Sequence, residues 1–543
     1  MTSHGEPRAG VDDSLPPLIS ALRGGACFDH PTDAIMVLQT HISYVLLTGT
    51  YAYKIKKPVS LPFLDFSTLE FRRHYCEEEL RINRRLAPEL YVDVVPITGT
   101  PQAPRMNGDG KAFEYAVKMV QFPDADRLDR VADRGELDDR QIRTLARKIA
   151  GFHDAVAVAD RNTPFADSES LRREIMDNFE SLSAQALPAD AASLLDDIRA
   201  WSARSLVELG AQFRARKRAG KVRECHGDMH LANMALLNRQ VTIFDALEFN
   251  ENLRWTDVQS ELAFLTMDLD YRGLPDLGWL LVSAYLEPTS DYAGLRVFRH
   301  YKVYRAMVRA KVAALRAGQC AAGTPAAREA VAEVVSHIRL AHAYLQASER
   351  TPLIITHGLS GSGKSWLSER LLKILGAICV RSDVERQRPA RSGDVRGDAL
   401  YSPAAITRTY EALAGHARTI LECGYPAIVD ATFLARDHRH RFLELAKELG
   451  VPFVILSLRA PVQLLETRIA KRQAQATDAS EATVEVLRHQ REDMEELNSE
   501  EREAALELDS EADSDVEALA RRILRSSTAP WRRRLDYPIH DER

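Results

Sequence analysis

Residues 353–375 read LIITHGLSGSGKSWLSERLLKIL, and the pattern GxxxxGK[ST] occupies residues 358–365 of this stretch. An apolar run precedes the pattern and a segment with helical spacing follows it, so the glycines connect a strand to a helix. Glycines let backbone N–H groups converge on phosphate oxygens, and the helix N-terminus adds a favourable dipole. The loop therefore predicts a nucleotide-phosphate site, made by Gly358, Ser360, Gly361, Ser362, Gly363, Lys364 and Ser365.

Carboxylates downstream of this loop fit the same chemistry. Lys364 would reach the β- and γ-phosphates of ATP, and the Ser365 hydroxyl would coordinate Mg²⁺. Asp430 ends the apolar run PAIVD and is placed as a second carboxylate for the metal-bound water. Asp383 follows AICVRS at the carboxyl edge where open α/β sheets bind ligands, and would accept a proton from a substrate hydroxyl.

The rest of this half predicts an α/β domain with a mostly parallel sheet. Short apolar stretches such as AICVRSD, PAIVDAT and PFVILSL alternate with helical segments, as in βαβ units. Arg468 and Arg472 lie four residues apart on one expected helix, so both would face the same way and clamp nucleotide phosphate. An ordinary basic helix face is the alternative interpretation of this pair.

The set GLSGSGKS, RSDVER, VDATF and RIAKR resembles small P-loop kinases with an AAA-type ATP-binding domain, such as gluconate kinase, polynucleotide kinase and zeta toxin. The resemblance covers roughly residues 350–528. It implies that Asp383 contacts the acceptor as a catalytic residue, with Arg386 beside it. It also implies that the segment around Asp430 and Thr432 lines the same cleft, which makes Arg386 and Thr432 candidate substrate-binding residues.

A second constellation lies at residues 226–245. HGDMHLAN is an HxDxxxxN pattern, and Asp245 follows twelve residues after Asn233 in IFDALEF. Phosphoryl transfer needs a carboxylate near the acceptor hydroxyl and oxygen ligands for magnesium. Asp228 suits the catalytic base, and Asn233 and Asp245 suit the metal. The alternative is an Asp/Asn turn followed by an unrelated strand acid.

This stretch resembles the aminoglycoside phosphotransferase and choline kinase group of protein-kinase-like enzymes, over roughly residues 25–345. The resemblance implies an α+β two-lobed domain in which Lys54 binds nucleotide phosphate and Glu79 is its ion-pair partner. Lys56 shares the strand face with Lys54, so the choice between the two lysines stays open. Asp257 matches a family acid that braces the catalytic loop. No GxGxxG precedes Lys54, and only Gly49 lies in that turn.

Composition narrows the classes of protein. The chain has 543 residues, 45% hydrophobic and 28% charged, with 72 Lys and Arg against 78 Asp and Glu. The net charge of −6 disfavours nucleic acid as the main partner. The six cysteines lie singly, which disfavours a disulfide framework or a zinc site. With neither a signal peptide nor a membrane-length apolar run, we expect a cytoplasmic protein.

Length and motifs together predict the domain organisation. We expect a disordered N-terminus at 1–20, then a kinase-like domain at 21–345 with an N-lobe at about 25–122 and a helical C-lobe at about 123–345. A P-loop domain would follow at 346–528, and a tail containing WRRRL at 529–543. Lys302, Arg305 and Arg309 share one helical face, which we expect to be solvated.

The predicted function is a bifunctional ATP- and Mg²⁺-dependent phosphotransferase, in which each half phosphorylates a hydroxyl of a small metabolite. One alternative is that one half binds nucleotide only to regulate the other. A second alternative is polynucleotide 5′-kinase activity in the P-loop half. The acceptor of either half and the oligomeric state are not readable from these motifs.

Overall fold

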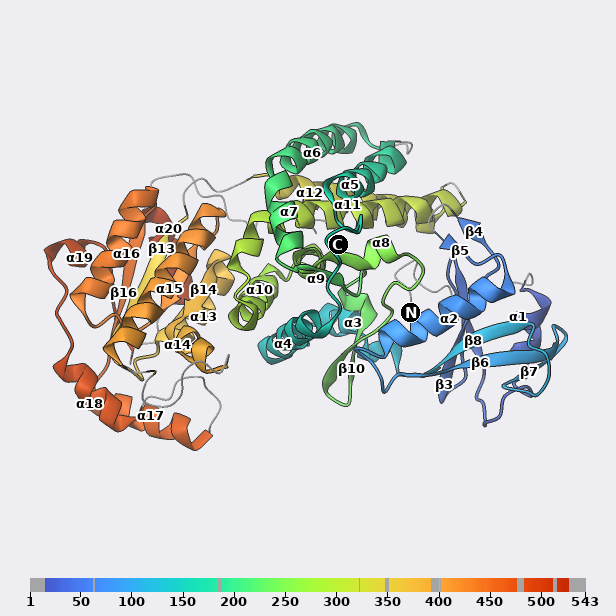
Figure 1. Cartoon of the computed structure of the whole chain (residues 1–543), viewed down its shortest axis with the longest axis horizontal. Coiled ribbons are helices and arrows are strands. Elements are labelled where there is room, and N and C mark those ends of the chain that lie inside the picture. Colours follow the sequence, from blue (N-terminus) through green and yellow to red (C-terminus); the bar gives the residue numbers. More distant parts are fainter. Residues whose placement is uncertain are drawn as a thin grey trace. The chain divides into compact units, whose positions relative to one another are not determined.

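The chain forms two compact units (Figure 1). One comprises the residues up to Arg272 together with Val297–Leu345, and the other comprises Gly273–Arg296 together with the residues from Gln346 onward. The computed structural model describes residues 15–61, 64–183, 187–321, 323–346, 351–391, 400, 402–475, 483–510 and 515–526.

The first unit begins with an antiparallel sheet of strand order β1-β2-β3-β8-β6-β7. Alternate residues of β3, such as Tyr53 and Ile55, are buried in one core, as expected for a strand rich in β-branched and aromatic residues. Helix α2 (Leu69–Asn83) is capped by Thr68 and packs on β6 and β8. The strands are β1 (Met36–Gln39), β2 (Ser43–Leu47), β3 (Tyr51–Lys56), β6 (Tyr91–Thr100), β7 (Ala103–Met106) and β8 (Glu114–Val120).

Helices dominate the rest of the first unit. Two short antiparallel ribbons, β9 with β12 and β10 with β11, flank the HGDMHLAN segment. The ribbon strands are β9 (Val222–Glu224), β10 (Met234–Leu237), β11 (Gln240–Ile243) and β12 (Trp255–Asp257). The main helices are α3 (Leu128–Asp133), α4 (Asp139–Ala155), α5 (Ser168–Ser183), α6 (Ala189–Glu208), α7 (Gly210–Arg218), α8 (Glu251–Arg254), α9 (Val258–Tyr271), α11 (Leu295–Gln319) and α12 (Pro325–Ala343).

The second unit contains a parallel sheet of strand order β14-β15-β13-β16-β17. Its strands are β13 (Leu353–His357), β14 (Ile378–Arg381), β15 (Ala427–Asp430), β16 (Phe453–Arg459) and β17 (Ala505–Asp509). Because helices cover the sheet, its inner strands β13 and β15 are buried along their whole length rather than alternately buried and exposed (Figure 1). The helices are α13 (Lys364–Leu375), α14 (Ser382–Arg391), α15 (Pro403–Glu422), α16 (Arg436–Leu449), α17 (Val462–Gln475), α18 (Val484–Glu492), α19 (Ser499–Glu503) and α20 (Val516–Ser526).

Helix α10 (Pro275–Thr289) belongs to the second unit, although the sequence analysis placed it in the first domain. It packs on α13 and β14. The Cys379 N–H donates to Ser283 Oγ at 3.2 Å, and Trp279 meets Tyr425 edge to face at 5.7 Å. An apolar helix carries no local signal of which core it covers, so periodicity could not assign it.

The predicted disordered N-terminus requires a correction. Helix α1 spans Pro17–Leu22, where proline suits the first turn. Its Ile19 and Leu22 are buried against the first-unit sheet, so apolar burial stabilises this short helix. Residues 1–14 and the predicted tail at 529–543 lie outside the described residues.

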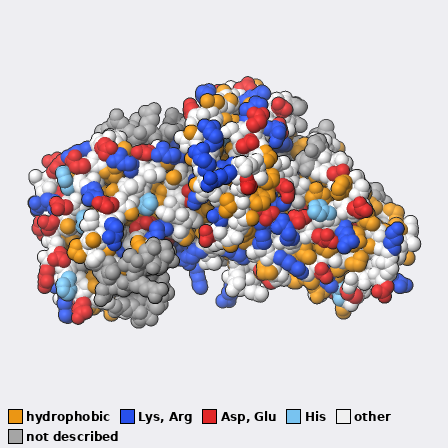
Figure 2. Space-filling model, viewed as in Figure 1, with side chains coloured by type: hydrophobic (Ala, Val, Ile, Leu, Met, Phe, Trp, Pro, Cys, Tyr) orange, Lys and Arg blue, Asp and Glu red, His pale blue; other side chains and the backbone are white. Residues whose placement is uncertain are grey.

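The surface shows charge of both signs. On the face drawn in Figure 2, acidic and basic side chains are interspersed with apolar and uncharged ones. This mixture agrees with the near balance of 72 basic and 78 acidic residues. Within the described part of the chain, we find no helix that is both long enough and apolar enough to cross a membrane.

Candidate active sites

The glycine-rich loop connects the end of β13 to the start of α13. Gly358 has φ of +139°, and a Cβ there would lie 2.5 Å from the Leu458 carbonyl oxygen. Gly361 has φ of +85°, and its Cβ would lie 3.0 Å from the Leu465 carbonyl oxygen. Only glycine fits these two positions, because both the backbone angle and the space exclude a side chain.

A cavity of about 520 Å³ lies over this loop. That volume falls within the range of about 300–1,000 Å³ typical of small-molecule sites. The strands that follow β13 in the chain, β14 and β15, lie on one side of it in the sheet, and β16 and β17 lie on the other side. The point where the chain changes sides is where open α/β sheets bind ligands. The predicted residues that line the cavity are Ser360, Gly361, Gly363, Lys364, Ser365, Asp383, Arg386, Asp430, Thr432 and Arg468.

Two predicted loop residues, Gly358 and Ser362, are not among the residues that line the cavity. The Ser362 carbonyl accepts a hydrogen bond from Ser510 Oγ at 2.6 Å. Arg472 lies on α17, and its side chain is outside the described residues.

Ser365 and Asp430 meet in the way a magnesium site requires. Asp430 ends β15 and is 5% exposed, and its carboxylate is hydrogen-bonded to the Ser365 side chain. Burial raises the pKa of Asp430, and Arg381, 3.7 Å away, counteracts this only in part. A buried carboxylate whose charge is incompletely compensated, next to a hydroxyl, is a donor set that fits Mg²⁺.

The opposite wall carries the predicted acceptor residues. Asp383 lies in the first turn of α14 and forms an ion pair with Arg386, one turn further along. Tyr410 of α15 holds Thr432 through a hydrogen bond and stacks on His438, with the ring centroids 3.7 Å apart. The wall therefore offers a carboxylate, a guanidinium and aromatic rings to a ligand.

Arg468 and Lys364 contact the loop itself. Arg468 donates to the Gly361 carbonyl at 3.3 Å and to the Ser510 carbonyl at 3.0 Å. Lys364 Nζ donates to the Leu359 carbonyl at 2.7 Å. Both cations thus lie at the phosphate side of the cavity.

In the first unit, the HGDMHLAN segment folds into a compact loop. Asn233 Nδ2 donates to Asp228 Oδ2 at 2.9 Å and to the Asp228 carbonyl at 3.0 Å. Asn233 Oδ1 is buried and has no hydrogen-bond partner among the described residues. A buried amide oxygen without a donor fits a metal ligand. Asp245 follows the β10–β11 ribbon with φ of +65°, a conformation uncommon outside glycine.

Lys54 is the lysine that meets both Glu79, its predicted partner, and Asp245. Its Nζ donates to Glu79 at 2.7 Å and to Asp245 at 2.8 Å, and all three side chains are at most 4% exposed. Burial would raise the pKa of Asp245, but the Lys54 ammonium lowers it to about 2. Lys56 instead joins Glu79, at 2.8 Å, to Glu248.

The space next to Lys54 is small. A cavity of about 30 Å³ lies between β2, β3 and β8, and Lys54, Asp245 and Phe122 are among the residues that line it. In this conformation, the side chains that would contact a nucleotide contact one another.

Two residues that hold the HGDMHLAN loop were not recognised as such in the sequence analysis. Glu261 of α9 accepts a hydrogen bond from the Gly227 N–H, and Arg305 donates to the Gly227 carbonyl at 3.1 Å. Glu261 therefore braces the loop directly. Asp257, the expected brace, instead caps α9 and pairs with Arg216 at 2.6 Å.

The expected solvated face of α11 is also wrong. Lys302 and Arg305 are each 4% exposed. Lys302 pairs with Asp270, which also accepts a hydrogen bond from Tyr344. Long side chains on a helix reach buried acids that lie far away in sequence, and no local pattern reveals this.

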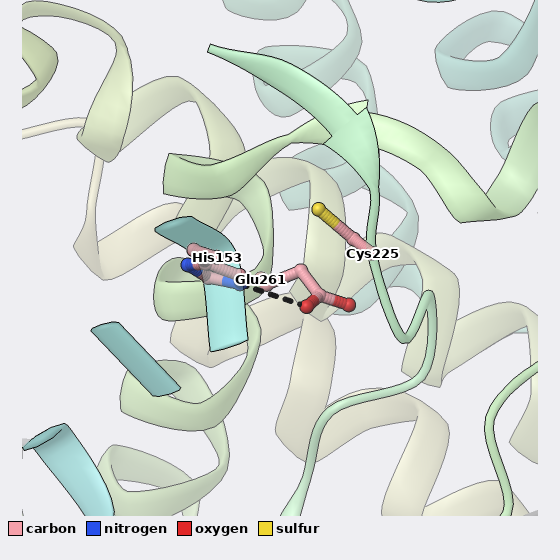
Figure 3. A group of neighbouring side chains, drawn as sticks. All are labelled: His153, Cys225 and Glu261. Atoms are coloured by element: carbon pink, nitrogen blue, oxygen red, sulfur yellow. Dashed lines mark hydrogen bonds and ion pairs between the residues drawn. The ribbon is translucent and has the colours of Figure 1, made fainter. Parts of the chain in front are cut away.

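Glu261 also belongs to a buried cluster with His153 and Cys225 (Figure 3). The ligand atoms of these three residues lie within 4.8 Å of one another. His153 Nε2 is 3.0 Å from Glu261, and the Cys225 thiol is 3.5 Å from the Thr256 carbonyl. Burial raises the pKa of Cys225 well above its ordinary value. Because each group has a protein partner and the thiol stays protonated, the cluster is better explained as a brace than as a metal site.

Residues 353–497 match a family model described as an AAA domain, which confirms the predicted nucleotide-binding domain in the second half. Uncharacterized proteins of Mycobacterium tuberculosis and Mycobacterium bovis are 29% identical over 479 residues, which cover 86% of this chain and 92% of each relative.

Two solved kinase structures are similar to parts of this chain. A choline/ethanolamine kinase family protein from Mesorhizobium loti covers 60% of this chain and 99% of its own, with 13% identity and a TM-score of 0.36. A gluconokinase from Sinorhizobium meliloti covers 33% of this chain and 92% of its own, with 21% identity and a TM-score of 0.24. The observed topology is the predicted one: a two-lobed α+β unit and an α/β unit with a parallel sheet.

Proposed function

We propose that the protein is an ATP-dependent phosphotransferase and that its P-loop half transfers the γ-phosphoryl group of ATP to a hydroxyl of a small metabolite. One observation carries this proposal: a single cavity is lined by Lys364, Ser365, Asp383 and Asp430. Phosphoryl transfer needs a phosphate cradle, a metal position and a carboxylate for the acceptor, and all three face the same space.

Each residue then has a role. The loop N–H groups, Lys364 and Arg468 bind the phosphates, with Arg472 as a further candidate. Ser365 and Asp430 would hold Mg²⁺, which neutralises phosphate charge when bound. Asp383 accepts the proton of the acceptor hydroxyl as that oxygen bonds to the γ-phosphorus and the bond to ADP breaks.

The acceptor wall suits a small hydroxylated ligand. Arg386 and Thr432 would orient the acceptor next to Asp383, because both line the cavity on that side. Arg386 also forms an ion pair with Asp383, so the two side chains lie together in the cavity.

The first unit is proposed as a second kinase site. Asp228 would be its base, Asn233 and Asp245 its metal ligands, Lys54 its phosphate lysine and Glu79 the partner of that lysine. The unpartnered Asn233 Oδ1 supports this assignment. The small cavity next to Lys54 instead favours a nucleotide-sensing role, in which this half regulates the other without turnover.

The test is ATP turnover by the full chain with a panel of hydroxylated metabolites. Variants Asp228→Asn and Lys364→Ala are compared with Lys447→Ala, an exposed surface lysine, as a control. We expect Lys364→Ala to abolish the P-loop activity. If neither Asp228→Asn nor Lys364→Ala alters turnover or nucleotide binding, the proposal is wrong.

Two outcomes separate the alternatives. Turnover that is insensitive to Asp228→Asn, together with ATP binding at two sites, supports the regulatory role of the first unit. Salt-dependent binding and phosphorylation of single-stranded oligonucleotides would favour the polynucleotide kinase alternative.

A further inference from the structure

Helix α18 is seated directly on the phosphate-binding loop. Leu487, on its inner face, is fully buried with Leu465 and Ile469 of α17. Leu359 of the loop packs against the same cluster. Thr483 caps the helix through the Val486 N–H, which fixes where it begins.

Gln490 lies three residues after Leu487 and therefore on the same face of the helix. The Ser360 N–H donates to Gln490 Oε1 at 3.0 Å. Gln490 also lines the cavity that contains Lys364, Asp383 and Asp430. A residue outside every sequence motif thus contacts a backbone amide of the phosphate loop.

The hydrogen bond fixes which way the amide points. A backbone N–H can only donate, so the oxygen of Gln490 faces Ser360 and its NH₂ group is directed to other acceptors. Phosphate oxygens are acceptors, and the loop is built to hold them in this cavity. The NH₂ group is a neutral donor, in contrast to the cations Lys364 and Arg468 on the phosphate side.

We infer that Gln490 is a positioning residue for the phosphoryl group that is transferred: its NH₂ donates to a γ-phosphate oxygen and distinguishes ATP from ADP. This inference rests on the proposed function of the P-loop half. A fixed amide dipole directed at the transferring group stabilises charge that spreads over the equatorial oxygens, without the reorganisation that water would require.

The experiment measures Kd for Mg-ATP and Mg-ADP by calorimetry on the full chain. Gln490→Glu keeps an oxygen for Ser360 but removes the donor and adds a negative charge. We expect ATP affinity to fall at least about tenfold and ADP affinity by no more than about threefold. Gln490→Ala should weaken ATP binding by about threefold to tenfold.

Gln463→Glu is the matched control, since it makes the same chemical change on an exposed position of α17 away from the cavity. We expect it to leave both affinities unchanged. Equal loss of ATP and ADP in Gln490→Glu, no change, or tighter ATP binding in Gln490→Ala would overturn the inference and leave the proposed function intact. Wild-type protein that binds neither nucleotide would overturn the proposed function itself.

Discussion

The two candidate sites use similar residues in opposite ways. In the first unit, Lys54 is held by the carboxylates of Glu79 and Asp245, and a cavity of about 30 Å³ lies next to it. In the second, Lys364 donates to a carbonyl of its own loop under a cavity of about 520 Å³. Charges buried without water need a partner. The first site fills its space with these protein partners, whereas the second has room for a ligand next to its lysine.

The largest expected effect would come from breaking the internal pairing of the first site. Lys54→Met leaves Glu79 and Asp245 buried without this cation, so we expect the first unit to lose about 3–5 kcal/mol of unfolding free energy. Denaturant unfolding of the full chain measures it. Lys447→Met, on the surface, should change nothing measurable, and an unchanged transition for Lys54→Met would refute internal pairing as the stabilising contact.

A second substitution tests whether helix α10 belongs to the second unit. Trp279→Ala removes a 6% exposed aromatic side chain of α10 that packs against Tyr425. We expect about 3 kcal/mol of destabilisation, confined to the P-loop unit. Hydrogen exchange in β13 and β16 reports that unit. Trp366→Ala, which removes a 49% exposed indole, is the control. Loss of protection in the first unit alone would contradict the assignment of α10.

The reciprocal experiment uses the lysine of the second site. Lys364→Ala should weaken ATP binding about 100-fold, or about 2.7 kcal/mol, because a cation that meets the phosphates is lost. Its unfolding free energy should change by only about 1 kcal/mol, since Lys364 donates to the Leu359 carbonyl and the buried carboxylate of Asp430 also has Arg381 to compensate its charge. Calorimetry measures the ATP affinity, and denaturant unfolding measures the unfolding free energy. Strong destabilisation by Lys364→Ala would contradict the difference between the two sites.

The smallest expected effect is a change of stability with pH that comes from Glu174. Nearby cations compensate the charge of this carboxylate less than Lys54 compensates that of Asp245. Burial raises the pKa of Glu174 from 4.5 to about 7, although Arg305 and Arg173 counteract it in part. The folded state therefore loses stability as pH rises from 4.5 through about 7. Glu174→Gln should match wild type at pH 4.5 and be more stable at pH 8 by about 1–2 kcal/mol. Thermal unfolding at both pH values measures it, and equal stability at pH 8 would contradict it.

Residues with short spacing lie close together because local geometry fixes them. Ser360 to Ser365 span one loop and the first turn of α13, and Asp228 and Asn233 lie within another loop, so sequence spacing alone placed each set together. Gln490 was not predictable: it lies 130 residues from Ser360, in a helix with no motif. Glu261 was also missed, because it lies 34 residues from Gly227. Asp257 lies nearby on the same segment, and nothing in the local sequence distinguishes the two acids as the brace of the loop.

The sequence by itself contained both candidate motifs, and it determined the parallel sheet of the second half and the two-lobed character of the first, because glycine loops, strand composition and helix periodicity act over few residues. Only the tertiary structure decided that Lys54 rather than Lys56 meets Asp245, and that α10 joins the second unit. It also revealed that one site is closed by its own ion pairs while the other holds an open cavity. These outcomes depend on which distant side chains compensate a buried charge, a property that packing sets.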